Sequence, residues 1–220
     1  PVTNTPAPPT PALPTEPPTP ALPTATPTIT LTPTPTVPMV TPKDVGVNCR
    51  LGPSTAWEVV GWLLPDQWAE IKGKDAEGNN WWYIENPTTP GTFCFVSGAV
   101  TVTAGNLAGI PTVPTPKASV TAVNVEMNPK NASITCGMFP FTFDVTFTIT
   151  TNGPTEVTFQ RILSNGNKAP PETVTFDKAE TKEFNDYYRV GAVGDYWFKV
   201  KVTSPNQVVG KGNATMSCTP

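Results

Sequence analysis

The feature that most constrains this chain is the density of proline in its first 42 residues. Fifteen of the 29 prolines lie there among thirteen threonines, and Glu16 is the only charged side chain. Proline fixes φ and lacks a backbone N–H, so this density excludes both helix and sheet. The segment also has almost nothing apolar to bury, so it cannot offset the entropy cost of ordering. We therefore predict a polyproline II stalk or tail over residues 1–42, about 130 Å long when fully extended.

The threonines of this stalk are candidates for O-linked glycosylation. Thr/Pro-rich stalks expose their hydroxyl groups along an extended chain, where they are easily modified. A bare spacer without sugar is the alternative. The candidate positions are Thr10, Thr15, Thr19, Thr24, Thr28, Thr34 and Thr36.

The rest of the chain divides into two foldable parts. A second Pro/Thr-rich stretch over residues 104–117 predicts a linker between a domain at 43–103 and a domain at 118–220. The first domain has four basic and seven acidic side chains, and residues 117–220 have ten and nine. Neither part has the basic stripe that binding of nucleic acid needs. Nor does the chain have an apolar run of the ~20 residues that a transmembrane helix requires.

The four cysteines fall two to a domain, and none forms a CxxC pair. Because the chain has no histidine, a zinc site would need cysteine or carboxylate ligands from both domains. Two disulfides within the domains, Cys49–Cys94 and Cys136–Cys218, are the better interpretation. They predict an oxidising compartment, and therefore a secreted or cell-surface protein.

Residues 43–103 predict five short strands in a small, nearly closed β-barrel. The expected strands are 59–64, 68–74, 81–85, 92–96 and 100–102. Asn48–Ser54, Val59–Gly61 and Trp81–Ile84 resemble bacterial SH3-like (SH3b) domains, which open with Asn-x-Arg-x-Gly-Pro and carry an aromatic strand near the middle. Asp66 stands where that family usually has glycine, and Cys94-Phe95-Val96 replaces its usual Gly-Trp-Val. The resemblance implies the barrel fold and a cell-wall ligand.

Residues 118–220 predict a β-sandwich of about seven antiparallel strands. Apolar residues alternate with polar ones from Phe139 to Thr150 and again from Tyr196 to Val202, which indicates strands with one buried face. The region resembles an immunoglobulin-like domain, with Gly194-Asp195-Tyr196 similar to the stretch before its central tyrosine. Domains of these two kinds joined by Pro/Thr-rich linkers are similar to secreted bacterial surface proteins.

Five of the six tryptophans lie between residues 57 and 82. They are either a surface on which a sugar or peptide stacks, or the bulky core of a small domain. Parity places Trp82 and Ile84 on one face of their strand, and Trp81, Tyr83 and Glu85 on the other. We predict that Trp62, Trp68 and Trp82 pack inside. The candidate ligand or subunit contacts are Trp57, Trp81 and Tyr83.

The sequence predicts no catalytic site, cofactor or metal. Without histidine no Ser-His-Asp or Cys-His arrangement exists, and phosphate-binding glycine motifs are absent. The carboxylates of Asp75 and Glu77 are expected in a turn, and those of Glu180, Glu183 and Asp186 in a polar loop.

Two functions remain open. One is a structural glycoprotein that self-associates into a surface filament or layer, with its stalk contacting neighbouring copies. The other is an adhesion module that binds cell-wall peptide or glycan.

Overall fold

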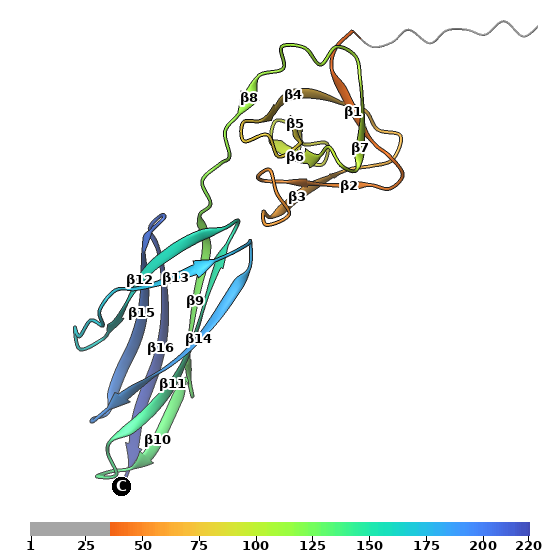
Figure 1. Cartoon of the computed structure of the whole chain (residues 1–220). Coiled ribbons are helices and arrows are strands. Elements are labelled where there is room, and N and C mark those ends of the chain that lie inside the picture. Colours follow the sequence, from red (N-terminus) through yellow and green to blue (C-terminus); the bar gives the residue numbers. More distant parts are fainter. Residues whose placement is uncertain (1–35) are drawn as a thin grey trace, which may run out of the picture. The chain divides into compact units, whose positions relative to one another are not determined.

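The structure is a computed structural model that describes residues 36–220, nearly all of one compact unit, Thr34–Pro220. Throughout these residues the fold is all-β without a helix, as predicted (Figure 1). The predicted polyproline II segment up to residue 35, and with it six of the seven candidate glycosylation sites, lies outside the described residues. The seventh, Thr36, is exposed.

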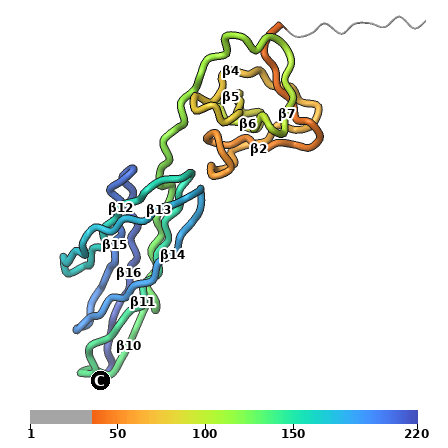
Figure 2. Tube along the Cα trace, viewed as in Figure 1, coloured from red at the N-terminus to blue at the C-terminus, as the bar shows by residue number. Residues whose placement is uncertain are grey.

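The first domain is a single sheet of eight strands curled into a small barrel (Figure 1). Its hydrogen-bonded order is β3-β2-β6-β5-β4-β1-β7, and β8 pairs with β4. The strands β4, β5 and β6 lie next to one another in the chain trace (Figure 2). The bounds are β1 Met39–Pro42, β2 Val47–Arg50, β3 Val59–Leu63, β4 Ala69–Asp75, β5 Trp81–Glu85, β6 Phe93–Ser97, β7 Thr101–Ala104 and β8 Thr112–Val113.

The barrel core surrounds the first disulfide. Cys49 and Cys94 are bonded, with their Cα atoms 5.4 Å apart and neither residue exposed to solvent. Val40, Leu63 and Ile84 pack around them. The predicted Cys49–Cys94 pairing is therefore confirmed, and the bridge lies inside the core rather than on the surface.

Two strands of the barrel lie in segments predicted to be stalk and linker. Strand β1 falls within residues 1–42, pairs with β4 and β7, and buries Val40 fully in the core. Strand β8 falls within residues 104–117 and pairs in parallel with the end of β4. The barrel thus begins before residue 43 and also binds part of the linker.

The second domain is a sandwich of a five-stranded sheet, β10-β16-β15-β12-β13, and a three-stranded sheet, β14-β11-β9. Figure 2 shows these strands along the C-terminal part of the chain. Their bounds are β9 Val120–Asn128, β10 Asn131–Thr135, β11 Phe141–Thr151, β12 Thr155–Leu163, β13 Glu172–Phe176, β14 Thr181–Val190, β15 Gly194–Ser204 and β16 Val208–Thr219.

The core of the sandwich contains the residues that the predicted alternation places on the apolar face of β11. Along β11, Phe143, Val145, Phe147 and Ile149 are buried, and the intervening residues are not. The ring of Phe147 lies 5.6 Å from that of Phe159 on the opposite sheet. Buried aromatic side chains of the two sheets therefore meet between the layers.

The second disulfide, Cys136–Cys218, is also formed as predicted, with 5.0 Å between the Cα atoms. It ties the segment after β10 to the end of β16. The backbone N–H of Cys136 also donates to the carbonyl of Thr219 at 2.8 Å. Cys136 is exposed, so this bridge fastens a margin of the sandwich and not its core.

The polar loop predicted around Glu183 and Asp186 is instead strand β14, an edge of the three-stranded sheet. Its polar residues alternate with partly buried ones, and ten residues pair with β11. Glu180, which precedes the strand, lies 3.6 Å from Lys182, while Asp186 lies 2.9 Å from Arg161. An edge strand with one solvated face tolerates this composition, which reads as a loop in isolation.

Candidate functional site

The loop between β2 and β3 is folded by Arg50 and Trp57. The guanidinium of Arg50 donates to the carbonyls of Thr55, at 3.1 Å, and Trp57, at 2.7 Å. Trp57 lies directly over Gly52, where a Cβ atom would overlap the indole ring. The Asn-x-Arg-x-Gly-Pro stretch therefore closes the loop and fixes the orientation of Trp57.

Trp57 is buried against the turn between β11 and β12. Only 4% of the residue is exposed, and a Cβ atom at Gly153 would overlap its ring. Two backbone hydrogen bonds flank this contact: Glu58 N–H to the carbonyl of Asn152 at 3.1 Å, and Ala179 N–H to that of Ala56 at 2.7 Å. Trp57 therefore packs as an interior residue, although it lies on a loop of the small barrel.

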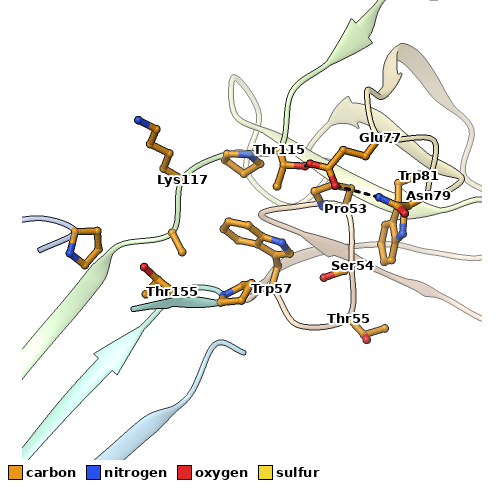
Figure 3. A pocket seen from close by; sticks show the side chains of 14 residues that line it. Pro53, Ser54, Thr55, Trp57, Glu77, Asn79, Trp81, Thr115, Lys117 and Thr155 are labelled. Atoms are coloured by element: carbon orange, nitrogen blue, oxygen red, sulfur yellow. Dashed lines mark hydrogen bonds between the residues drawn. The ribbon is translucent and has the colours of Figure 1, made fainter. Parts of the chain in front are cut away.

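Beside Trp57 lies a cavity of about 770 Å³, which we call the Trp57–Trp81 cavity (Figure 3). Its walls combine the two indole rings, four prolines, and hydroxyl and amide groups. It also has one carboxylate and one ammonium group. The lining residues are Pro53, Ser54, Thr55, Trp57, Glu77, Asn79, Trp81, Thr115, Pro116, Lys117, Ala118, Pro154, Thr155 and Pro205.

The polar wall of the cavity is organised around Glu77 in the β4–β5 turn. Its carboxylate accepts hydrogen bonds from the Thr115 hydroxyl at 2.9 Å and from the Asn79 amide at 3.5 Å (Figure 3). Backbone pairing of β8 with β4 brings Thr115 to this position. The segment predicted as a linker thus forms one wall of the cavity.

The structure brings together two of the three predicted contact residues. Trp57 and Trp81 line the same cavity, although Trp81 is only 9% exposed. Tyr83 lies elsewhere on that face of the sheet, stacked on Phe93 with 5.2 Å between ring centroids. Burial raises the pKa of the Tyr83 phenol above its usual value.

The prediction that Trp62 and Trp68 pack inside is wrong, because both are about half exposed. Gly61, not Trp62, takes the inward position on β3, where the buried Asn86 side chain leaves no room for a Cβ atom. Trp68 lies two residues before the solvated Glu70, so its side chain lies on the same exposed face of the chain. Trp82 does pack against the core as predicted. The inward positions of β3 and β4 are thus occupied by smaller residues, such as Gly61 and Ile71.

Sequence reasoning missed Lys117 and Thr155 as cavity residues. They are separated from Trp57 by 60 and 98 positions in the chain, and no local pattern links residues so far apart. Pro53 was noted only as part of the Asn-x-Arg-x-Gly-Pro stretch, and Pro116 only as part of the predicted linker. The cavity is a product of tertiary packing.

Within residues 36–220 we find no group of three or more His, Cys, Asp or Glu side chains that could hold a metal ion. No helix capable of crossing a membrane occurs in that part of the chain.

Together these features define an all-β, disulfide-bonded protein with an immunoglobulin-like sandwich and an aromatic cavity. No family model matches the chain, and no curated protein does. Among solved structures it is similar to the CARDB domain of the PF1109 protein from Pyrococcus furiosus, solved with di-metal ions. That match has 14% identity and a TM-score of 0.36, and covers 44% of this chain and 94% of that one.

A second similarity is to a beta-glucosidase from Listeria innocua, at 14% identity and a TM-score of 0.29. It covers 51% of this chain, which spans only 18% of that enzyme. Similarities at this level of identity and TM-score say nothing about the function of this chain.

Proposed function

We propose that this chain is a non-catalytic, extracellular structural protein whose copies associate head to tail. In this proposal the Pro/Thr-rich N-terminal segment of one copy binds the folded part of the next. The observation that carries it is the Trp57–Trp81 cavity, in which two indole rings and four prolines meet hydroxyl groups. Grooves lined by aromatic residues are the usual receptors for polyproline II segments.

The energetics favour this kind of ligand. A polyproline II segment is already extended, so it loses little conformational entropy when it binds. A contact between different surfaces of identical copies is heterologous, and it propagates into a filament unless its rotation closes a ring. Such a contact would make the proline-rich segment the connector of an assembly.

Extracellular localisation is part of the proposal. Both cysteine pairs form disulfides, and such bridges persist in oxidising compartments. Two further features favour a cell-surface location: the resemblance of the barrel to bacterial SH3-like domains and the Pro/Thr-rich composition of residues 1–35.

A cell-wall glycan or peptide is the second candidate ligand, and one observation favours it. Trp68 lies beside a smaller cavity of about 310 Å³, lined in addition by Glu70, Lys72, Glu85 and Pro87 among others. A half-exposed indole ring next to carboxylates suits a sugar, because the ring stacks on the C–H face and the carboxylates accept from hydroxyl groups. In this alternative the protein is an adhesion module on a stalk.

Deletion of residues 1–35 tests the proposed assembly. We expect the full chain to form filaments visible by electron microscopy, and the shortened chain to remain monomeric in sedimentation velocity. The cut spares Met39–Pro42, which the barrel needs as strand β1. Circular dichroism should therefore show both domains folded. Filaments of unchanged lattice from the shortened chain would assign assembly to the β domains instead.

Native protein is expected to carry O-linked sugar on several threonines of the N-terminal segment. Glycans would stiffen the extended chain and shield it from proteases. Mass spectrometry of intact chains purified from the natural source should give a mass above the 23.4 kDa of the polypeptide. A native mass equal to that of the polypeptide contradicts the prediction.

A further inference from the structure

We infer that the Trp57–Trp81 cavity binds the part of a neighbouring copy's N-terminal segment around Glu16, and that Glu16 pairs there with Lys117. This inference rests on the proposed function and names the site and register of its contact. It assigns a receptor surface, a ligand segment and one ion pair, each of which can be tested separately.

The first support is the size and chemistry of the cavity. At about 770 Å³ it lies within the range of roughly 300–1,000 Å³ typical of ligand sites. Its apolar lining consists mainly of four prolines and the small exposed parts of the two indole-bearing residues, Trp57 at 4% and Trp81 at 9%. The hydroxyls of Ser54, Thr55 and Thr155 line the same space and can bond the free carbonyls of an extended proline-rich segment.

The second support is charge complementarity. Two charged residues line the cavity, Glu77 and Lys117. Glu77 already accepts hydrogen bonds from Thr115 and Asn79. Lys117 is exposed, and none of the ion pairs formed among residues 36–220 includes it. The cavity therefore presents an unengaged ammonium group.

The matching carboxylate is Glu16, the only charged residue in residues 1–42. It stands in the run Pro-Ala-Leu-Pro-Thr-Glu-Pro-Pro, between apolar residues that suit the proline-rich lining of the cavity. Among the threonines and prolines of the segment, Glu16 is the one side chain that can select a single register by charge. The rest of the segment supplies repeated, nearly equivalent contacts.

The cavity beside Trp68 suits this segment less well. Glu70 and Glu85 line it together with Lys72, and Lys72 already pairs with Glu70 at 2.7 Å. Its net negative lining would repel Glu16. Charge thus distinguishes the Trp57–Trp81 cavity from the cavity beside Trp68 as a receptor for an acidic, proline-rich segment.

The segment is long enough for a contact between copies. The described fold starts at residue 36, and the carbonyl of Pro38 accepts a hydrogen bond from Ile71 N–H at 2.8 Å, which anchors the chain to β4. Twenty residues separate Glu16 from residue 36, about 60 Å in polyproline II. Such a span can reach another copy, and it can also fold back onto its own cavity.

A charge exchange between two chains tests the inference and separates these cases. Chains with Lys117→Glu or with Glu16→Lys should each need about five- to tenfold more protein to assemble, as expected for reversing one surface ion pair. Mixing the two variants should restore assembly, because each segment then meets a complementary cavity on the other chain. Sedimentation velocity and electron microscopy measure both effects.

The matched control is Lys72→Glu, a reversal at an exposed lysine beside Trp68, which should leave assembly unchanged. A strong effect of Lys72→Glu with none of Lys117→Glu would overturn the inference and place the contact at the smaller cavity. If the single variants are impaired and their mixture is not rescued, the contact between copies through this ion pair is refuted. Wild-type chains that never assemble would refute the proposed function itself, whereas wild-type assembly insensitive to Lys117→Glu refutes only this inference.

Discussion

Replacing Cys49 and Cys94 by alanine is expected to unfold the barrel under conditions in which the sandwich remains folded. The bridge closes a loop of 45 residues, worth about 4 kcal/mol in the chain-entropy estimate. Both cysteines are also fully buried, so their removal takes packing from the centre of a small core. Domains near 60 residues have little stability to spare. Urea unfolding followed by tryptophan fluorescence measures the loss, because five of the six tryptophans lie in the barrel.

The control is the same replacement at Cys136 and Cys218. Its loop of 82 residues gives a similar estimate, about 4.5 kcal/mol. The sandwich, however, keeps a large core that this exposed bridge does not enter. We expect a lower unfolding midpoint but a folded domain at room temperature. A barrel that keeps its wild-type midpoint without Cys49–Cys94 would contradict the central role of that bridge.

Trp57→Ala is expected to cost about 3–5 kcal/mol of unfolding free energy, the usual range for removing a buried tryptophan. Only 4% of Trp57 is exposed, and it packs between Gly52 and Gly153. Gly153→Ala should also destabilise, because the added methyl group overlaps the indole ring. Combined with Trp57→Ala, the Gly153→Ala change should cost little, since the ring is gone. Chemical denaturation of the four proteins gives the coupling energy, expected at about 0.5–3 kcal/mol.

Trp62→Ala provides the matched control for this cycle. About half of Trp62 is exposed on β3, so the change should stay within about 0.5 kcal/mol of wild type. Equal losses for Trp57→Ala and Trp62→Ala, or strict additivity with Gly153→Ala, would show that the Trp57–Gly153 contact does not contribute as described.

The strands that sequence predicted best are those with strong alternation. Phe141–Thr151 was evident because a strand buried on one face must alternate apolar and polar residues. Strands β1 and β14 were missed for opposite reasons. β1 is short and lies between prolines, whereas β14 is an edge strand rich in polar residues. Their pairing partners lie more than 25 residues away, and a local pattern carries no information about such partners.

The turn between β3 and β4 contains a residue with a positive φ angle. Asp66, which lies between β3 and β4, adopts a φ of 63°. Glycine is the default residue at such a left-handed position, and aspartate is among the few others that tolerate it. The left-handed conformation at this position is thus compatible with the aspartate that stands there.

The sequence alone determined the all-β class and the cysteine pairing, and it predicts an extended proline-rich segment. These follow from local chemistry: residue alternation, the missing N–H of proline, and two cysteines in each foldable part. Only the tertiary structure decided which tryptophans are buried and where a cavity forms. Trp57 is interior because Gly52 and Gly153 leave space on both sides of its ring, and Trp62 is exposed because Asn86 occupies the space beneath Gly61. Burial depends on what the rest of the chain places opposite a residue, and that is fixed only when distant segments pack together.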